Sequence, residues 1–485
     1  MSIKDFSKNT VIYSIGSIGL RFSAFLLLPL YTKYLTVENF GFLQTLLLTI
    51  QIMITIIDVG VRSSIVRFLE EYKSHNKIGI LLGSSLFINF LSSFVVTLFS
   101  YLILVPFFNG IVDSENISKL ILLVSLTAIF QTLSLNIMAY YRAQNESLKY
   151  MFVSISAAVL LIITTIIFLV YLQMEIEGVL ISQIITYFLV WFLASIINFA
   201  KHGFAISKAA IKQIFSFGFP LIFAMSGDLI TSTTAIYFLT FFHGLTEVAI
   251  YSLGFKLAQI ATMIIIGPFQ MAYEPYIYSQ QDNPKLKTII AQLTTYLLLS
   301  FGLISFLLVY ILRDLMNILF TSNYSSSYYI VFFILPGIGL IGMQYIAQSM
   351  LHLKNKTNIT GITIATVTIL SIILNYFFIQ YWSIPGLIIS YNLVMALTTF
   401  VLLKYGLKEF PVKFEIKRLI IGIIIFLFLI TLICLLHNSS NYIFYSLPII
   451  IFFICIYALF HYKYFNTNEI KFINEYISKM NLFNN

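Results

Sequence analysis

Apolar runs long enough to cross a bilayer recur along the whole of this chain. A spanning helix needs about 20 consecutive apolar residues, because the hydrocarbon core of a bilayer is about 30 Å thick. Hydrophobic residues make up 59% of the sequence and charged residues only 10%, whereas a soluble domain carries about 25% charged residues. Helices satisfy their own backbone hydrogen bonds inside lipid, so the sequence predicts an all-α polytopic membrane protein.

The runs predict about 14 transmembrane helices. The first set lies at residues 9–32, 40–61, 78–107, 118–140, 150–172, 178–200, 214–242, 248–273, 288–312, 328–350, 358–381 and 384–403. Two additional runs, 419–437 and 442–462, follow near the C-terminus. The first run is too long and too polar along one face for a signal-peptide core, so we expect it to be kept as the first helix.

Lys and Arg residues predict the orientation of these helices, because cytoplasmic loops accumulate positive charge. With the N-terminus placed inside, most of the 28 Lys and Arg residues fall in connections on that side. Only Lys33, Lys119 and Arg313 fall in outside loops, and Arg21 and Lys256 lie within apolar runs. We therefore expect both termini in the cytoplasm, and we interpret the net charge of +9 as an orientation signal rather than a nucleic-acid interface.

The twelve runs of the first set read as two copies of six. Matching residues recur at a nearly constant offset of about 209 residues: Glu38 with Glu247, Asn145 with Asn355, and Gly178 with Gly386. An even number of helices in each copy makes the two pseudo-repeats parallel, related by an axis along the membrane normal. We expect an N-terminal six-helix bundle at 1–203, a second bundle at 204–406, and two C-terminal helices with a cytoplasmic tail at 407–485.

Arg21 is the residue that most needs an explanation, because it lies near the middle of the first apolar run. A charge at the centre of a spanning helix costs about 2.5–3.5 kcal/mol, so Arg21 should face a partner or a watery cavity. Asp228 lies at nearly the equivalent depth in the second copy, and Lys256 lies one run later. Two interpretations stay open: Arg21 and Asp228 form an ion pair between the halves, or Arg21 and Lys256 attract an anionic group in a hydrated lumen.

Other polar residues extend this candidate site. Gln51 lies on a helical stripe with Asp58, and Gln259 lies on one with Lys256, so we predict that Gln51, Gln259 and Asp228 also line the lumen. Asp228 and Asp58 are candidates for a coupling-ion site, and each also has the simpler interpretation of a structural partner in packing.

Prolines and small residues predict local features of the helices. A proline removes a helical hydrogen bond and permits a kink, and the hinge candidates are Pro29, Pro220, Pro268 and Pro336. Gly79 and Gly83 form a small-xxx-small pair, which favours tight helix packing over a dimer interface.

The sequence lacks the motifs of common catalytic sites. It contains no Gly-rich phosphate loop with Lys, no Gly-x-Ser-x-Gly motif and no His/Cys/carboxylate cluster at metal-ligand spacing. We therefore predict no catalytic residue, no metal site and no cofactor. If the chain is a transporter, its transport can be coupled to a gradient of H⁺ or Na⁺ or to the membrane potential.

Several segments resemble a known family. They are Leu35–Gly41, Asp58–Gly60 followed by Arg62 and Arg67, and Tyr141–Asn145 after the fourth run. With the repeated six-helix layout, they resemble the polysaccharide-biosynthesis flippases of Wzx type. These flippases belong to the multidrug/oligosaccharidyl-lipid/polysaccharide exporter superfamily, so the resemblance implies a MATE-like fold.

The resemblance implies that an undecaprenyl-diphosphate-linked oligosaccharide is moved from the inner to the outer leaflet of the bacterial cytoplasmic membrane by alternating access. Such transport serves the assembly of O-antigen or capsule, and it implies contacts with membrane lipids and with polysaccharide polymerase or export partners. A basic central cavity is associated with the family, and Arg21 and Lys256 are the residues of this chain that could supply it.

Two other functions stay open at this point. A cation-coupled exporter of small amphipathic molecules with the same fold would use Asp228 as its ion or proton site. A membrane-embedded sugar polymerase or glycosyltransferase would need an acidic catalytic site facing outside. The acidic residues there lie in short loops with no shared architecture: Asp113, Glu115, Glu175, Glu177 and Asp314.

Overall fold

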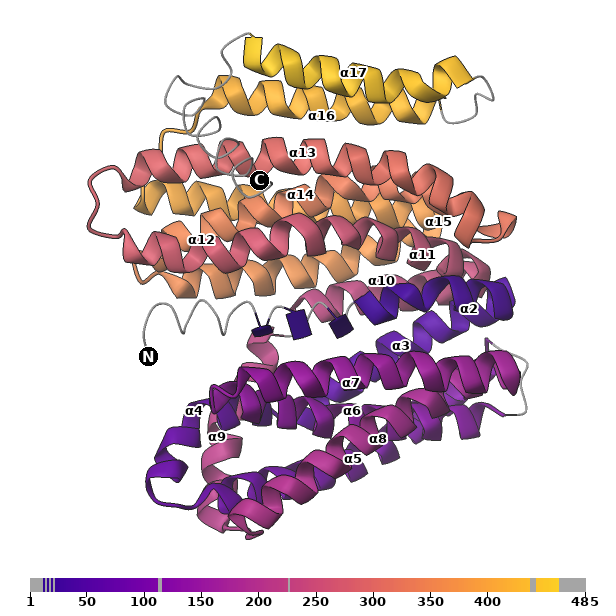
Figure 1. Ribbon diagram of the computed structural model, residues 1–485, viewed down its shortest axis with the longest axis vertical. Coiled ribbons are helices and arrows are strands. Elements are labelled where there is room, and N and C mark those ends of the chain that lie inside the picture. The colour runs from indigo at the N-terminus through magenta and orange to yellow at the C-terminus, as the bar shows by residue number, and fades with distance from the viewer. Residues whose placement is uncertain are drawn as a thin grey trace, which may run out of the picture. The chain divides into compact units, whose positions relative to one another are not determined.

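Helices account for nearly all of the described part of this chain (Figure 1). The computed structural model describes residues 12–13, 15–16, 19–20, 22–111, 116–225, 227–436 and 442–461. Within these ranges there is no β-strand, and the helices are joined by short turns. The prediction of an all-α fold is therefore confirmed.

The chain forms two compact units. Unit 1 comprises Met1–Lys256, Leu319–Ser327 and Gly361–Val394, and unit 2 comprises Leu257–Ile318, Tyr328–Thr360 and Met395–Asn485. The helices that end before Lys256, all of them in unit 1, are α2 (Leu28–Tyr34), α3 (Val37–Asp58), α4 (Val61–Ser74), α5 (Ile78–Asn109), α6 (Ile117–Ala143), α7 (Ser147–Thr165), η1 (Ile166–Tyr171), α8 (Glu175–His202), α9 (Lys208–Met225) and α10 (Gly227–His243). The other helices are α11 (Leu245–Ala261), η2 (Thr262–Ile266), α12 (Gly267–Ser279), α13 (Leu286–Leu319), η3 (Ser322–Tyr324), α14 (Ser327–His352), α15 (Thr357–Glu409), α16 (Ile416–Leu436) and α17 (Tyr442–His461).

The described residues contain 9 helices that are long and apolar enough to cross a membrane. The chain is therefore a multi-pass membrane protein. From residue 40 onward, each predicted run coincides with a helix or with consecutive helices of the structure. The total of about 14 spans stays a prediction, as do the boundaries of the two bundles.

The predicted position of Arg313 in an outside loop is wrong. The helix α13 continues to Leu319, beyond the expected end at residue 312, and Arg313 is only 4% exposed within it. Its guanidinium lies over the ring of Tyr310 and 3.7 Å from a carboxylate oxygen of Asp314. Hydropathy ended the run at the charge, whereas in the structure these neighbours let the charge stay in the helix.

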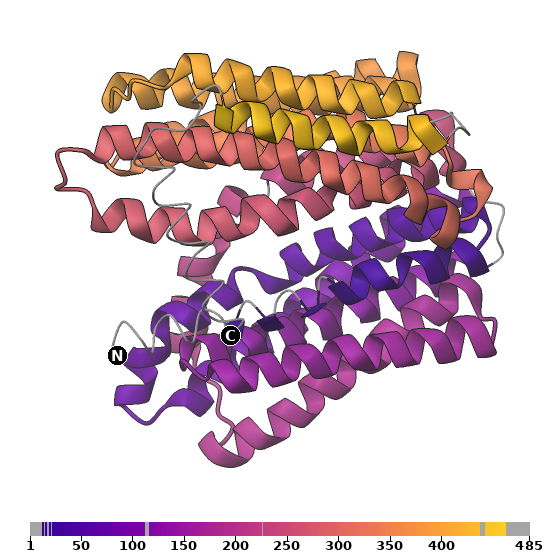
Figure 2. The ribbon, with the colours of Figure 1, turned by 45° about the horizontal axis from the view of Figure 1, so that its top comes forward.

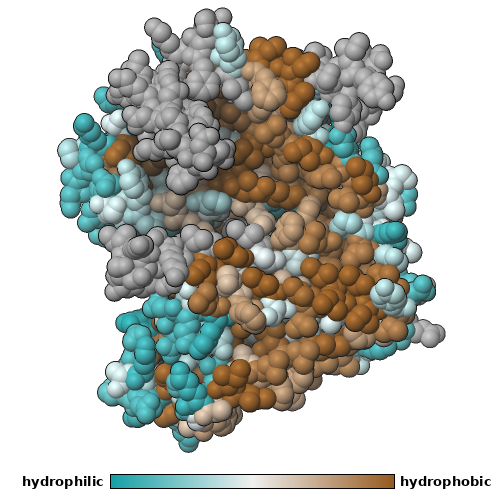
Figure 3. Space-filling view, viewed as in Figure 1, coloured by the Kyte–Doolittle hydropathy of each residue, from teal (hydrophilic) through white to brown (hydrophobic). Residues whose placement is uncertain are grey.

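Unit 1 packs its first spanning helices side by side. The helix α6 contacts α3, α4, α5, α7 and α8, so it is the central helix of this group, and Figures 1 and 2 show α5, α6, α7 and α8 running alongside one another. In Figure 3 the flanks of α5, α7 and α8 are hydrophobic, and hydrophilic residues gather at the end where α4 lies. This distribution is typical of helices whose outer faces meet lipid.

Local backbone conformations repeat at the offset that the sequence predicts. Asn145 and Asn355 both have left-handed backbone torsions, with φ values of 60° and 56°. Gln173 and Ser383 share the same feature, with φ values of 51° and 50°. A Cβ atom on Gly178 would contact the carbonyl oxygen of Phe168, and a Cβ atom on Gly386 would contact the carbonyl oxygen of Phe378. The equivalent residues of the two copies are therefore Asn145 and Asn355, Gln173 and Ser383, Gly178 and Gly386, and Phe168 and Phe378. The pseudo-repeat is therefore visible in the turns as well as in the sequence.

The helix α15 covers two predicted runs without a loop between them. Ser383 interrupts it with torsions of φ 50° and ψ −132°, and Pro385 follows two residues later. The break corresponds to the predicted boundary between the runs at 358–381 and 384–403. Hydropathy alone separates the runs, but it does not show that the chain reverses direction over so few residues.

Gly79 and Gly83 allow the segment after α8 to lie directly on α5. A Cβ atom on Gly79 would contact the carbonyl oxygens of His202 and Gly203, and one on Gly83 would contact that of Ala205. The Ser84 hydroxyl accepts a hydrogen bond of 3.1 Å from the backbone N–H of Ser207. The prediction of tight packing is therefore confirmed, and the partner of the glycine face is a loop of the same unit.

We expect the variant Gly83→Ala to lower the melting temperature of the detergent-solubilised protein. Overpacking against a backbone atom costs about 1–3 kcal/mol, because the backbone must shift. Gly361→Ala is the matched control, since a Cβ atom at Gly361 in α15 meets nothing within 4 Å and Ala is favoured over Gly in a helix by about 1 kcal/mol. Equal melting temperatures for the Gly83→Ala variant and the wild type would contradict the packing described above.

Candidate functional site

The structure locates the predicted lumen residues only in part. Arg21 lies outside the described residues, and the side chain of Asp228, at the start of α10, also lies outside them. Lys256 lies in α11, is half-buried and forms no ion pair with the residues that the structure describes. The choice between an Arg21–Asp228 pair and an open basic lumen therefore stays a prediction.

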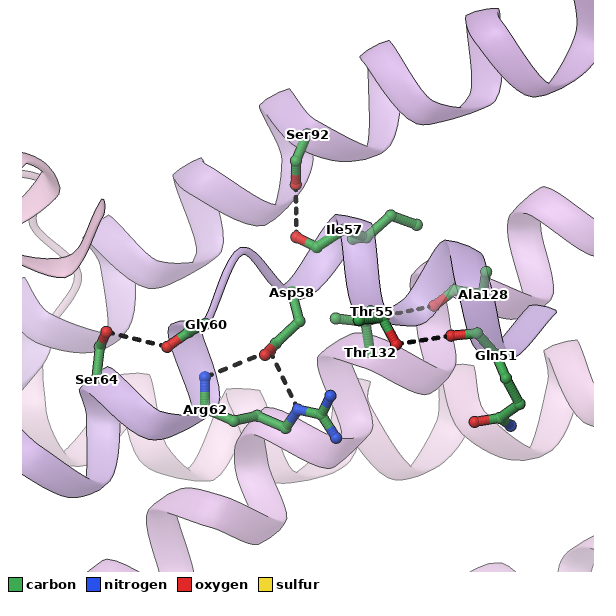
Figure 4. Close-up of polar contacts among 10 residues, drawn as sticks. All are labelled: Gln51, Thr55, Ile57, Asp58, Gly60, Arg62, Ser64, Ser92, Ala128 and Thr132. Atoms are coloured by element: carbon green, nitrogen blue, oxygen red, sulfur yellow. Dashed lines mark hydrogen bonds and ion pairs between the residues drawn. The ribbon is translucent and has the colours of Figure 1, made fainter. Parts of the chain in front are cut away.

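Gln51 and Gln259 are both exposed, one on α3 and the other on α11. Figure 4 shows the amide of Gln51 lying apart from the pair formed by Asp58 and Arg62. Lumen-facing and lipid-facing side chains both appear exposed when no lipid is present. The assignment of the two glutamines to a lumen therefore stays a prediction.

Asp58, a predicted candidate for the coupling-ion site, is the last residue of α3, and its contacts link α3 to the start of α4. Its carboxylate oxygen accepts hydrogen bonds from the backbone N–H and from Nε of Arg62, at 3.3 and 3.2 Å (Figure 4). Val59 and Gly60 between them have left-handed torsions, with φ values of 47° and 72°. A Cβ atom on Gly60 would meet the backbone of Gly218 in α9, so this junction touches another helix of unit 1 without room for a side chain. These contacts support the structural interpretation of Asp58.

The proline hinge candidates lie at two kinds of position, in the first turn of a helix or in a helix interior. Pro29 opens the short helix α2, and Pro268 follows the π-helix η2 in the first turn of α12. Pro220 and Pro336 lie inside α9 and α14. Each position has a local irregularity or a missing hydrogen bond, but whether the helices bend there during function stays a prediction.

A buried polar network joins α10 to both parts of α15 in unit 1. The Asn375 amide donates to the carbonyl oxygen of Thr231 and to the Thr234 hydroxyl, each at 3.3 Å. The Ser390 hydroxyl donates to Asn375 Oδ1 at 2.6 Å, across the break at Ser383. Asn375 and Ser390 are almost completely buried. The network therefore holds the two parts of α15 together and fixes both against α10.

The same network continues toward the two ends of α10. The hydroxyls of Thr231 and Ser371 lie 2.9 Å apart, and His243 Nε2 lies 2.6 Å from the carbonyl oxygen of Ile379. Asp228 lies one helical turn before Thr231 on α10. The paired hydroxyls of Thr231 and Ser371 thus lie one helical turn along α10 from the position of the predicted coupling carboxylate.

Sequence reasoning missed Asn375 and Ser390. The available signal was a lone Asn in the middle of the apolar run 358–381, because polar side chains within spanning helices usually face other helices. Asn375 is uncharged, so a search for charges within apolar runs does not find it. Ser390 carried no signal of its own, since Ser is common in spanning helices and its partner is known only from the fold.

Hydroxyl contacts also tie α3 to α10. The hydroxyls of Thr45 and Thr240 lie 3.3 Å apart, and those of Thr49 and Tyr237 lie 2.6 Å apart. These contacts connect the second predicted helix of the first repeat with the first predicted helix of the second repeat, within unit 1. The interface uses small hydroxyl residues, which permit close approach in a membrane.

Comparison with known proteins identifies relatives of this chain. Residues 6–281, more than half of its length, match the family described as polysaccharide biosynthesis protein. A Haemophilus influenzae protein of the Lsg locus is 25% identical over 339 residues, which cover 68% of this chain and 80% of that protein.

Solved transporters share the fold. The lipid II flippase MurJ, in an inward closed conformation, superposes with a TM-score of 0.71 at 17% identity, covering 93% of this chain and 99% of that chain. A Vibrio cholerae MATE transporter, VcmN, superposes with a TM-score of 0.58 at 15% identity, covering 84% of this chain and 97% of that one. The MATE-like fold that the resemblance implies is therefore confirmed.

We expect Asn375→Ala and Ser390→Ala each to lower the melting temperature, with a double variant that loses less than the sum. An interhelical hydrogen bond in a membrane protein contributes about 0.6 kcal/mol on average and up to about 1.7 kcal/mol, and residues that share a bond are not additive. Thr431→Ala in α16 is the control, because among the described residues the Thr431 hydroxyl bonds to its own helix backbone alone, at 2.7 and 3.0 Å. Strict additivity would show that Asn375 and Ser390 are not coupled.

Proposed function

This chain belongs to the polysaccharide biosynthesis protein family, and we propose that it is a flippase for a lipid-linked oligosaccharide. In this proposal an undecaprenyl-diphosphate-linked oligosaccharide moves from the inner to the outer leaflet of the cytoplasmic membrane by alternating access. The product serves surface polysaccharide such as O-antigen or capsule. The observation that carries the proposal is the family match over residues 6–281, together with the fold that the chain shares with MurJ.

The charges inside the apolar runs support an anionic cargo. Arg21 and Lys256 are the basic residues that the orientation of the helices does not explain. A guanidinium presents a planar fork that matches two oxygens of a phosphate, and an ammonium adds a point charge. A diphosphate in a low-dielectric cavity needs such partners, because an unpaired charge in the bilayer is costly.

The proposed orientation of the protein rests on the Lys and Arg residues in the connections between helices. Both termini lie in the cytoplasm in this proposal, since most of the 28 Lys and Arg residues would then lie on the inner side. The cargo is made on that side and would enter when the cavity opens inward. Polymerase or export proteins that receive the oligosaccharide would act on the other side.

Asp228 is our candidate for coupling to H⁺ or Na⁺. It precedes Thr231 by one turn on α10, where Thr231, Ser371 and Asn375 supply neutral oxygen atoms. Carboxylate and neutral oxygen atoms are the ligands that hard cations prefer. A proton bound to Asp228 could replace the cation, because a proton and a bound cation each neutralise the charge of the carboxylate in the membrane.

We expect deletion of the gene to leave lipid-linked oligosaccharide on the cytoplasmic face and to remove surface polysaccharide. Complementation with Arg21→Gln should restore neither, whereas Arg21→Lys should restore part of the export because it keeps the charge. Lys73→Gln is the control, since Lys73 is an exposed residue at the end of α4. Membrane levels of each variant are measured by immunoblot, and wild-type export with Arg21→Gln would exclude Arg21 from the cargo site.

The same deletion separates the competing functions. A multidrug exporter with this fold would give drug sensitivity and normal surface sugar. A sugar polymerase would give normal flipping with shortened polymers. Either result would contradict the flippase proposal.

We expect Asp228→Asn to remove the dependence of flipping on an imposed H⁺ or Na⁺ gradient in proteoliposomes. The amide cannot exchange a proton in this pH range or supply a negative charge to a cation. Asp282→Asn is the control, because Asp282 is an exposed residue in the turn between α12 and α13. Unchanged gradient dependence in Asp228→Asn would exclude Asp228 as the coupling residue and leave the flippase function standing.

A further inference from the structure

A stripe of polar side chains runs along one face of α5. Ser85, Asn89, Ser93 and Thr97 follow one another at every fourth residue, so they lie above one another on the helix. Ser85 and Ser93 are each only 3% exposed and Asn89 only 1%. The hydroxyls of the three Ser and Thr residues, and both polar atoms of Asn89, have no hydrogen-bond partner among the residues that the structure describes. We call these four residues the α5 stripe.

Two residues of the α5 stripe, Ser85 and Asn89, line a pocket within unit 1. Ser85 and Asn89 face Asn136 of α6 and Ser195 and Asn198 of α8 around this pocket. Asn136 Oδ1 is also buried without a partner among the described residues. Apolar and aromatic residues complete the lining, and Trp191, Phe199 and Leu133 are among them.

The chemistry of the lining selects the occupant. Asn89 presents an N–H donor and a carbonyl acceptor, so its occupant must both accept and donate hydrogen bonds. A bare cation would satisfy only the oxygen and leave the N–H groups unpaired. The lining contains no Asp, Glu, Lys, Arg or His, so a charged occupant has no counter-charge there. An apolar lipid chain would leave every polar atom unsatisfied.

Polar contacts lead from the pocket toward the ends of α6 and α8. The Asn198 amide donates to the Tyr141 hydroxyl at 3.0 Å. Next to it, the hydroxyl of Tyr140 lies 3.0 Å from Nε2 of His202, the last residue of α8. Polar groups are therefore present along the route from the pocket to the end of the bundle, where hydrophilic residues gather.

We propose that the pocket and the α5 stripe hold ordered water molecules, which form an internal hydration site between α5, α6 and α8. Water is the smallest neutral molecule that both donates and accepts hydrogen bonds, and buried water typically bonds to polar groups that lack a protein partner. The site lies within unit 1, on helices that carry none of the proposed cargo or coupling residues. The inference therefore does not depend on the proposed function.

The test is radiolytic hydroxyl-radical footprinting of the full chain in lipid nanodiscs, with ¹⁸O-labelled water. Radicals formed from bound water oxidise the side chains beside it, so Trp191 should incorporate ¹⁸O strongly. Phe94 on α5 is the internal reference, because it is a 70% exposed apolar side chain outside the pocket lining that we expect to face lipid and to stay unlabelled.

Variants assign the labelling to the stripe. Asn89→Leu keeps the number and branching of the side-chain heavy atoms without the amide, and we expect a several-fold loss of label at Trp191. Ser85→Ala, a smaller change, should lower the label in the same direction if Asn89→Leu does not fold. Ser92→Ala is the matched control, because the Ser92 hydroxyl is already paired, with the backbone carbonyl oxygens of Ile57 at 2.7 Å (Figure 4) and of Asn89 at 3.1 Å, and it is not one of the four stripe residues.

Two results would overturn the proposal. Labelling of Trp191 no greater than that of Phe94 would show that no water is held beside the stripe. Equal labelling of Trp191 in the wild type, Asn89→Leu and Ser85→Ala would show that the water there is not held by these residues.

Discussion

A polar group inside the hydrocarbon core of a bilayer must be paired by the protein or by a small ligand, because lipid cannot replace water as its partner. This constraint accounts for the principal contacts of unit 1. Asn375 joins α10 to α15, Asp58 is held by Arg62, and the hydroxyls of Thr49 and Tyr237 meet between α3 and α10. Each contact gives a polar group a hydrogen-bond or ion-pair partner and holds one segment of the chain against another. The same requirement motivates water as the occupant of the α5 stripe.

Close backbone approach is the second determinant of the packing. Lipid offers little hydrophobic driving force for helix association. Small residues therefore contribute by letting two backbones come into close van der Waals contact. Gly60 meets Gly218 at the junction of α3 and α4, and Gly83 meets the segment after α8. These contacts leave no room for a side chain, so the junctions are defined by the absence of a Cβ atom.

Much of the fold could be predicted from the sequence, because bilayer thickness sets helix length and charge sets loop side. The predicted runs coincide with observed helices from α3 to α17, and the offset that links Asn145 to Asn355 reappears as a shared left-handed turn. Hydropathy did not predict the end of α13, because that helix continues past the buried charge of Arg313, which lies beside Tyr310 and Asp314. The site was less predictable. Charged candidates stand out in an apolar run, whereas neutral ones such as Asn375 do not.

The sequence by itself determined that the chain is a helical, multi-pass membrane protein with an internal repeat, because these properties depend on run length, period and composition along one dimension. Only the tertiary structure decided which polar residues share a contact. Ser390 and Asn375 meet because the chain reverses at Ser383, and Asn89 and Asn136 line one pocket because α5 packs on α6. Hydrogen bonds act over about 3 Å, and residues distant in the chain come that close only after the helices have packed.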